Sequence, residues 1–350
     1  MTANALDLSV ALSPAAEALT AQVLAQALRF GLVGQQNLID TVENRLQVSR
    51  GGQGPGLQFA SASGDRLTLS DADQQAQVPA GGTGVGAAAW GRAYGTMGNA
   101  SATGALPAFG EHRIGALMGV DWHSDQFVGG AAFDYGNTNA AFADGSSTRL
   151  DSYEGVVYGG WRGGPAYVTA LASGGANDYT ISRNLMPFGL TGFATSAPTG
   201  TLVTAFGEAG YGFAVGEGTW LTPYVNLDYI HQSVGAFTEA GSFGALSVAA
   251  ANGSSLQTTV GLRASTTIDL GSHGVLVPEV RAGWAHEFLD ASQTLTAQLA
   301  GTAASPFTFV GTSFGRDSAV VGVGVSHEFA PGASFFVDYD GKFTGGFNQN

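Results

Sequence analysis

Two segments of this sequence have the residue types of a catalytic or phosphate-binding loop. Gly311-Thr312-Ser313-Phe314-Gly315 matches the G-x-S-x-G pattern, in which a strand-to-helix turn of an α/β sheet exposes a nucleophilic serine. Here the segment stands where a loop enters an expected strand, so that turn is missing. Gly82-Thr83-Gly84-Val85-Gly86 lacks the preceding strand and the following lysine of a phosphate loop. We therefore expect neither hydrolysis nor phosphate binding at these glycines.

Two histidine–glutamate pairs are the remaining candidates for catalysis. His286-Glu287 and His327-Glu328 match the start of the H-E-x-x-H zinc motif, whose second histidine follows one helical turn later. The fourth residue after each histidine is Asp290 or Pro331, so the second ligand is missing. The other histidines show no metal-binding spacing, and no cysteine is present to act as a ligand or nucleophile. The sequence predicts no enzymatic activity, no catalytic residue, no metal site and no cofactor.

The elements that would position such residues are strands. About a dozen stretches of about ten residues alternate apolar residues with polar residues or glycine, as transmembrane β-strands do. In the stretch 275–288, apolar Leu276, Val280 and Trp284 share one parity, whereas the charged residues Glu279 and Arg281 share the other. Successive side chains of a strand point to opposite faces. The charges of this stretch therefore fall on one face.

The spacing of these stretches predicts an up-and-down barrel. Eleven strands are expected, at residues 88–98, 111–122, 126–138, 150–162, 165–176, 200–214, 219–232, 255–269, 274–288, 315–329 and 333–344. The gaps are long after the first, third, fifth, seventh and ninth strands and tight after the others, where turn formers such as Gly163-Gly164 and Pro331-Gly332 occur. Up-and-down order then places all long loops on one side of a bilayer. A Greek-key sandwich gives no reason for that sorting.

Composition favours a membrane barrel over a soluble sandwich. Only 11% of the residues are charged, against about a quarter in a typical soluble domain, and 54 of 350 are glycine. The formal charge of −14 excludes a basic surface for nucleic acid. No run of eighteen apolar residues could form a membrane helix. Aromatic residues near the strand ends are expected to form lipid-facing girdles: Trp122, Trp161, Trp220, Trp284, Phe288 and Phe329.

The N-terminal region differs from the rest of the chain. Ser13-Pro14 is a plausible helix start, since the hydroxyl caps backbone amides and proline needs no amide partner there. Apolar residues recur at helical spacing over residues 19–28 and again over residues 38–46. Residues 51–87 then turn to Gly, Ser, Asp and Gln, which is typical of a flexible connection.

Short motifs along the chain occur in the order found in a known family. They lie at residues 90–95, 158–161, 166–168, 208–211, 223–225, 260–263, 278–288, 316–318 and 338–341. Each motif alone is weak, but over roughly residues 30–347 the ordered set resembles the autotransporter translocator domain. The resemblance implies a twelve-stranded outer-membrane β-barrel of the type V secretion pathway. It also implies a helix in the pore that connects to an exported N-terminal passenger.

The resemblance divides the chain into three parts: residues 1–50 with a passenger remnant and the pore helix, the flexible linker 51–87, and the translocator barrel 88–350. The implied partners are outer-membrane lipid, the chain's own passenger, the barrel-assembly machinery and periplasmic chaperones. Asn350 is not the terminal aromatic residue of the family, and the first residues show no secretory signal. We therefore expect the twelfth strand and the signal peptide to lie outside this sequence.

The polar parity of the strands identifies the residues expected to face the lumen. The acidic ones are Asp121, Glu154, Glu208, Asp228, Glu279, Glu287, Glu328, Asp338 and Asp340, and the basic ones are Arg92, Arg113, Arg162, Arg263, Arg281 and Lys342. The acids outnumber the bases, so the lumen is predicted to be net acidic. Arg29, Arg45 and Arg50, on or just after the helical segment, would pair with it, because a buried charge needs partners. The competing interpretation is that these three arginines are solvated.

Three functions remain open at this level. The leading hypothesis is an outer-membrane translocator and anchor for the chain's own passenger. The alternatives are an outer-membrane small-solute channel with an incidental helix, and a surface adhesin, either as a barrel or as a soluble β-rich protein. A translocator should be nearly closed by its helix, whereas a channel should conduct whether or not the helix is present.

Overall fold

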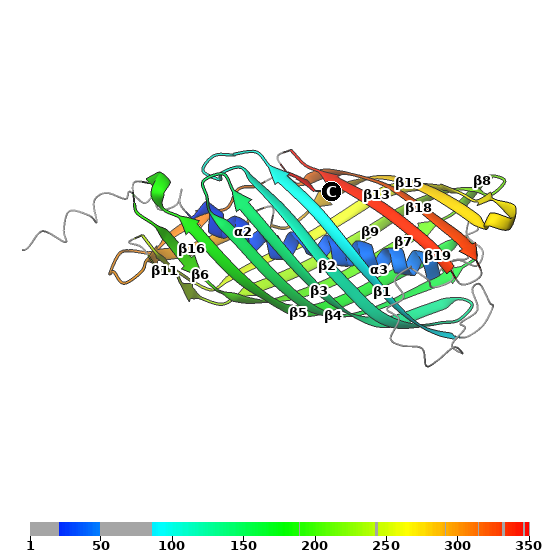
Figure 1. Cartoon of the computed structure of the whole chain (residues 1–350), viewed down its shortest axis with the longest axis horizontal. Helices are drawn as coiled ribbons and strands as arrows, with labels where there is room; N and C mark the ends of the chain where they lie inside the picture. The colour runs from blue at the N-terminus through cyan, green and yellow to red at the C-terminus, as the bar shows by residue number, and fades with distance from the viewer. Residues whose placement is uncertain are drawn as a thin grey trace, which may run out of the picture.

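The computed structural model describes residues 21–49, 86–188, 190–241, 244–290, 292–313, 315–330, 333–345 and 347–349. Within these residues, twelve antiparallel strands form a closed, tilted barrel around a helix (Figure 1). The wall consists of β1 (Gly86–Ala100), β2 (Phe109–His123), β3 (Phe127–Phe142), β4 (Ser147–Gly163), β5 (Ala166–Asn184), β7 (Thr199–Tyr211), β9 (Thr219–Val234), β13 (Ala251–Thr266), β15 (Val275–Glu287), β18 (Asp317–Ala330), β19 (Ala333–Phe343) and β20 (Phe347–Gln349). The predicted fold class is confirmed.

Neighbouring strands of the wall are neighbours along the chain. β5 pairs with both β4 and β7, and the order continues through β9, β13, β15, β18, β19 and β20 back to β1. Mostly short turns join strands at one end of the barrel, called the turn end. At the other end, the loop end, the connections after β1, β5, β9 and β15 are long. The long gap expected after the third strand is instead a tight turn at residues 143–146, because β3 and β4 both extend beyond their predicted ends. In the β4–β5 turn Gly164 has a φ of +61°, a left-handed conformation that glycine adopts without a steric penalty.

The twelfth strand, expected outside this sequence, is represented in the wall by β20. Asn348 pairs with Asn99 of β1 and with Phe343 of β19. The ladder to β1 comprises Gly98–Ala100 and that to β19 comprises Lys342 and Phe343. The described part of β20 therefore joins the barrel edges near the loop end.

Several short elements extend the barrel beyond its wall. At the loop end, β10 (Phe237–Thr238), β12 (Leu246–Val248), β16 (Thr294–Leu299) and β17 (Phe307–Val310) form a separate four-stranded sheet, here called the loop sheet. Also at that end, β6 (Phe193–Ser196) pairs with β5 and with β11 (Ala240–Gly241), near the 3-10 turn η1 (Met186–Phe188). At the turn end lie β8 (Phe213–Gly216), β14 (Ile268–Asp269) and η2 (Gly271–His273). The loop sheet was not predicted from the sequence.

The helical segment lies inside the barrel along its axis (Figure 1). It consists of α2 (Gln22–Val33) and α3 (Gln35–Ser49), joined at Gly34, which keeps right-handed helical angles. Neither described helix is long and apolar enough to cross a membrane. The predicted helix start at Ser13-Pro14 lies outside the described residues. The two helices differ in character, because α2 is mostly apolar and α3 mostly polar.

Apolar side chains enclose α2 near the loop end. Phe30 lies edge-on to Phe109, with ring centroids 5.6 Å apart, and Phe142 completes the aromatic cluster. The same buried cluster contains Leu24 and Leu28 of α2 and reaches the loop sheet through Leu246, Val248, Leu295, Ala297 and Phe309. The loop sheet therefore covers the N-terminal half of the helix and removes its apolar surface from water.

α2 approaches the wall closely enough at Gly31 to leave no room for a side chain. A Cβ there would overlap the Gln232 amide and lie 2.5 Å from the Tyr179 hydroxyl. Alanine is about 1 kcal/mol better than glycine in a free helix, but this overlap costs about 1–3 kcal/mol. We expect Gly31→Ala to lower the unfolding temperature of the barrel, measured as the temperature at which the band of the folded protein on an SDS gel is replaced by that of the unfolded protein. The control is Gly155→Ala on the wall, whose added Cβ meets no atom within 4 Å; a higher transition temperature for Gly31→Ala would contradict the close approach.

Candidate functional site

The charged residues predicted to face the lumen lie on the inner parity of the strands. Asp121, Glu154, Glu208, Asp228, Glu287, Arg113 and Arg263 are buried. Arg92, Arg162, Glu279, Arg281, Asp338, Asp340 and Lys342 are partly buried on the same inner parity. Arg162 stands at the turn end and donates to the Asp125 carbonyl oxygen at 2.9 Å. The side chain of Glu328 lies outside the described residues.

Arg45 of α3 forms a two-pronged ion pair with Asp121 of β2. Its Nε lies 2.7 Å from Oδ2 and its Nη2 lies 2.9 Å from Oδ1. The Arg45 guanidinium also stands 5.8 Å from the centroid of the Trp90 ring, whose indole N–H donates to the Tyr158 hydroxyl at 2.6 Å. Both charged side chains are almost completely buried. Two parallel hydrogen bonds of this kind fix orientation as well as charge.

Arg263 of β13 joins α3 to the wall on another side of the bore. Its Nη2 lies 2.8 Å from Oε1 of Glu43, and its Nε lies 3.2 Å from Oε1 of Glu279. Its Nη1 donates to the Tyr167 hydroxyl at 3.1 Å, and that hydroxyl donates to Glu208 at 2.7 Å. One buried guanidinium thus neutralises carboxylates from the helix and from two strands of the wall.

A third group of contacts involves Arg281 of β15 and two aspartates of β19. Arg281 Nη2 lies 2.6 Å from Asp338 Oδ2, and its Nε donates to Asp340 Oδ1 at 2.7 Å. Asn44 of α3 donates to Asp338 Oδ2 at 3.0 Å. The helix therefore supplies an amide donor to a carboxylate that the wall arginine already neutralises.

Amide side chains extend this network to the start of α3. Gln35 donates to Glu154 at 2.6 Å and accepts a hydrogen bond from Thr204 at 2.8 Å. Gln36 donates to Asp228 at 3.3 Å. Polar groups in a low-dielectric interior need such partners, since leaving one unpaired is costly. α3 is consequently bonded to strands on several sides of the bore.

Several hydrogen bonds between α2 and the surrounding barrel have backbone carbonyl acceptors. The Gln232 amide donates to the Leu28 carbonyl at 2.9 Å. Near the loop sheet, Gln22 donates to the Val310 carbonyl at 2.8 Å and Arg29 to the Thr312 carbonyl at 3.2 Å. Arg29 was predicted to pair with lumen acids; it also interacts electrostatically with Glu287 and Glu111. Arg50 lies outside the described residues.

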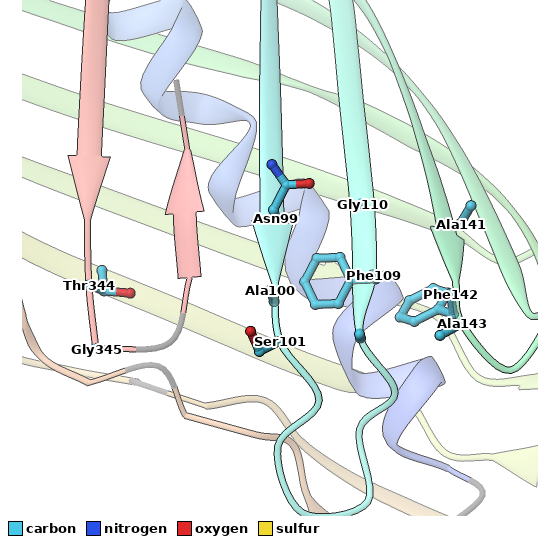
Figure 2. Close-up of a pocket in the computed structure, with 11 residues that line it drawn as sticks. Asn99, Ala100, Ser101, Phe109, Gly110, Ala141, Phe142, Ala143, Thr344 and Gly345 are labelled. Carbon is cyan, nitrogen blue, oxygen red and sulfur yellow. The ribbon is translucent and has the colours of Figure 1, made fainter.

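Among the described residues, one cavity lies against the helical segment and another at the mouth of the barrel. A cavity of about 90 Å³ lies beside α2 and is lined by Arg29, Gln36, Gln257, Glu287 and Lys342 among others. A wider groove of about 720 Å³ opens at the loop end between the ends of β1–β3 and Thr344–Gly345 (Figure 2). Its floor includes the phenylalanines that pack against Phe30. The narrow cavity corresponds to the volume of a few water molecules.

The outer parity of the wall is apolar. Exposed valine, leucine and isoleucine side chains cover it on most strands, as in Ile114, Val157 and Val260. Of the residues predicted to form lipid-facing girdles, Trp122, Trp161, Trp284 and Phe288 are exposed on this surface. This arrangement suits hydrocarbon outside and a polar bore inside.

Trp220 is the exception among the predicted girdle residues. It pairs with Ser265 and shares the parity of Thr222 and Tyr224, which are buried toward the lumen. The assignment of Trp220 to the lipid face was therefore incorrect, because an indole near a strand end was placed by its type and not by its parity. The side chain of Phe329 lies outside the described residues.

Sequence reasoning missed several residues of this site. Asp40, Glu43 and Asn44 interact with the wall from α3, although only the arginines of the helix were considered. Asp134 is buried on the inner parity, 3.6 Å from Arg113. Strand parity could have identified Asp134, since Asp134 and Gly130 lie on the same face. Glu43 and Asn44 follow Asp40 by three and four residues, so all three lie on one face of α3. That spacing could have identified them as contacts to the wall.

The motifs considered for catalysis have no catalytic surroundings in the structure. Ser313 is exposed in the loop between β17 and β18. His286 and Glu287 point to opposite faces of β15, and His286 contacts Asp317 at 2.8 Å on the outside. Among the described residues, no three His, Asp or Glu side chains are arranged to hold a metal ion.

The fold and the occupied bore define a class of protein, namely outer-membrane β-barrels plugged by their own N-terminal segment. The structure resembles the translocator domain of the autotransporter NalP from Neisseria meningitidis, with a TM-score of 0.63 at 16% identity over 92% of this chain and 96% of that one. The transport unit of the autotransporter AIDA-I from Escherichia coli has a TM-score of 0.55 at 16% identity, over 85% of this chain and 96% of that one. The β domain of the Bordetella autotransporter BrkA has a TM-score of 0.56 at 14% identity, over 75% of this chain and 94% of that one.

Sequence comparison assigns the family. The profile of the autotransporter beta-domain matches residues 89–340. The chain therefore belongs to the autotransporter β-domain family, and its barrel is an outer-membrane translocator domain. It is also 27% identical over 273 residues to an extracellular serine protease of Serratia marcescens, covering 75% of this chain. This chain spans a quarter of the length of that relative.

The Arg45–Asp121 pair should be the most sensitive contact between helix and wall. Arg45→Ala leaves a buried carboxylate without its cation, which costs about 3–5 kcal/mol. We expect a lower urea midpoint for unfolding of the barrel in lipid vesicles. Arg45→Lys should lose less, because the charge remains but the two-pronged geometry does not.

Two further variants distinguish the buried pair from a general loss of charge. Asp121→Asn in the Arg45→Ala background removes the orphaned charge and should recover part of the midpoint. Arg149→Ala breaks an exposed pair with Asp151 and should change the midpoint little. Equal shifts for Arg45→Ala and Arg149→Ala would contradict a structural role for the buried pair.

Proposed function

We propose that this barrel translocates and then anchors its own N-terminal passenger, with α2 and α3 as the tail that remains in the bore. The observation that supports this proposal is a polar helix bonded to opposite sides of a plugged barrel. Breaking such buried contacts is costly, so α3 is suited to hold the end of an exported chain. The family and its outer-membrane location agree with this function.

The two halves of the tail have different tasks in this proposal. α3 resists withdrawal through Arg45, Glu43 and Asn44, which bond to separate strands. α2 seals the external half by filling an apolar ring of wall and loop-sheet side chains. An apolar seal excludes water without requiring matched hydrogen bonds. The barrel then retains the passenger and keeps the membrane closed.

The remaining parts of the proposal concern the whole chain. Residues 1–50 would comprise the passenger remnant and tail, residues 51–87 a linker, and residues 88–350 the barrel. Assembly would use the barrel-assembly machinery and periplasmic chaperones, and the outer face would contact outer-membrane lipid. Translocator barrels are not catalytic, and we propose that this chain likewise catalyses no reaction.

Deleting residues 21–49 tests the translocator against the small-solute channel. In planar lipid bilayers the intact protein should conduct weakly, because α2 and α3 occupy the bore. The deletion should produce a much larger single-channel conductance. A solute channel would conduct strongly with the helix in place. Large and equal conductances for both proteins would therefore contradict the proposal.

A reporter fused ahead of the helix tests export directly. A small, single-domain reporter should become accessible to protease on intact cells when it precedes the full chain. The control carries the same fusion with β13–β15 deleted, which opens the wall. Surface exposure of the reporter from the control, at the same level, would show that export does not depend on the barrel.

A further inference from the structure

Two residues of the lipid-facing girdle, Trp284 and Phe288, belong to an aromatic patch with polar contacts that an apolar lipid chain does not require. On β15 and β18, the rings of Trp284 and His286 lie 5.5 Å apart, and those of His286 and Phe288 lie 4.8 Å apart. Asp317 accepts hydrogen-bond contacts from the Trp284 indole at 3.1 Å and from His286 Nδ1 at 2.8 Å. These four residues form the β15–β18 patch. The two large rings are about half exposed, and the Asp317 carboxylate is 63% exposed.

A second patch on β3 and β4 also combines aromatic rings with a carboxylate. The rings of Tyr135 and Tyr153 lie 5.2 Å apart. Asp151 accepts a hydrogen bond from the Tyr135 hydroxyl at 2.8 Å and from Asn137 at 2.7 Å, and it pairs with exposed Arg149 at 3.0 Å. These five residues form the β3–β4 patch.

The two patches stand on opposite walls of the barrel. Between β3 and β18 the wall order runs through β2, β1, β20 and β19, and between β4 and β15 it runs through β5, β7, β9 and β13. A combination of closely spaced aromatic rings with a hydrogen-bonded carboxylate therefore occurs twice at positions half a turn apart. A repeated arrangement on an otherwise apolar surface points to a common ligand in the surrounding membrane.

Both patches lie at the external limit of the apolar band. Toward the turn end, the next outward residues are apolar: Ala282 and Val280 below Trp284, and Phe133 below Tyr135. Toward the loop end they become polar, as at Asn139 and Asp290. Since long loops face the exterior in this class, the patches lie at the level of outer-leaflet headgroups.

The chemistry of the patches fits sugar rings better than phosphate alone. Aromatic faces pack against the apolar C–H faces of a saccharide, and a carboxylate accepts hydrogen bonds from its hydroxyls. An exposed carboxylate repels phosphate, so the patches would contact the saccharide part of a lipid and not its phosphate groups. A phospholipid without sugar offers no ring for the aromatic faces. The indole N–H bond to Asp317 fixes the Trp284 ring before any ligand arrives, which lowers the entropy cost of binding.

We propose that the two patches bind the sugar-bearing headgroups of outer-leaflet glycolipids, one on each side of the barrel. The patches are continuous with the lipid-facing surface, so the occupant is a lipid of the same leaflet. Girdle tryptophans at the turn end differ: within the described contacts, neither Trp122 nor Trp161 bonds to a carboxylate. Binding at two opposed points would tie the barrel to its leaflet without involving the bore.

Native mass spectrometry of the full chain in detergent tests the proposal, with lipooligosaccharide as the probe and a chelator present to remove bridging cations. The intact protein should retain two tightly bound glycolipids. Trp284→Leu with Asp317→Asn should retain one, as should Tyr135→Leu with Tyr153→Leu and Asp151→Asn. Each altered site should bind about tenfold more weakly, which corresponds to about 1.4 kcal/mol. Leucine keeps the surface apolar, so insertion into lipid should persist.

The matched control is Trp161→Leu with Asp269→Asn, which changes an exposed indole and an exposed carboxylate at the turn end. It should keep two bound glycolipids. Phosphatidylglycerol should not displace lipooligosaccharide from the intact protein, and this measurement stands even if a variant fails to fold. Displacement by phosphatidylglycerol, equal loss in the control, or two retained glycolipids in both patch variants would each overturn the proposal. Export of a fused reporter is measured separately and should be unchanged in the patch variants.

Discussion

The requirement that every backbone amide and carbonyl in hydrocarbon be hydrogen-bonded determines this structure. A sheet satisfies that requirement only when it closes on itself, and the ladders from β1 round to β20 provide the closure. Closure then separates alternate side chains into a lipid-facing and a lumen-facing set. Charged residues are placed in the bore, where they need partners. The helix supplies those partners, so the wall and the plug depend on each other.

The bore has two zones with different physical character. Around α2 it resembles the core of a soluble protein, with Phe30 set among phenylalanines of the wall. Around α3 it contains ion pairs and amide hydrogen bonds, together with a small apolar cluster that includes Leu38 and Leu46. An apolar seal is tolerant of sliding, whereas paired charges are specific for position. Seal and position are therefore provided by different segments of one tail.

Strand parity made most of the wall predictable, and its limits explain the errors. The expected strands ended too early at the loop end, as at residue 138 where β3 continues to Phe142. Apolar alternation stops at Asn137 because the wall leaves the lipid there, while backbone pairing continues. The loop sheet was missed because β10 and β12 are too short to show a period, and the short alternation of β16 and β17 lies in a gap that was assigned to one long loop. Parity also identified the lumen charges, but partner choice depends on tertiary packing that one sequence does not display.

The pairing of Arg45 with Asp121 also sets the register of the tail. An α-helix turns by about 100° per residue, so a slip of one residue would swing the guanidinium away from its carboxylate. A slip of seven residues restores the facing side but would bring Leu38 to that aspartate. The ion pair therefore favours one axial position of the helix in the barrel. That position determines which residue of the tail lies at the mouth of the bore.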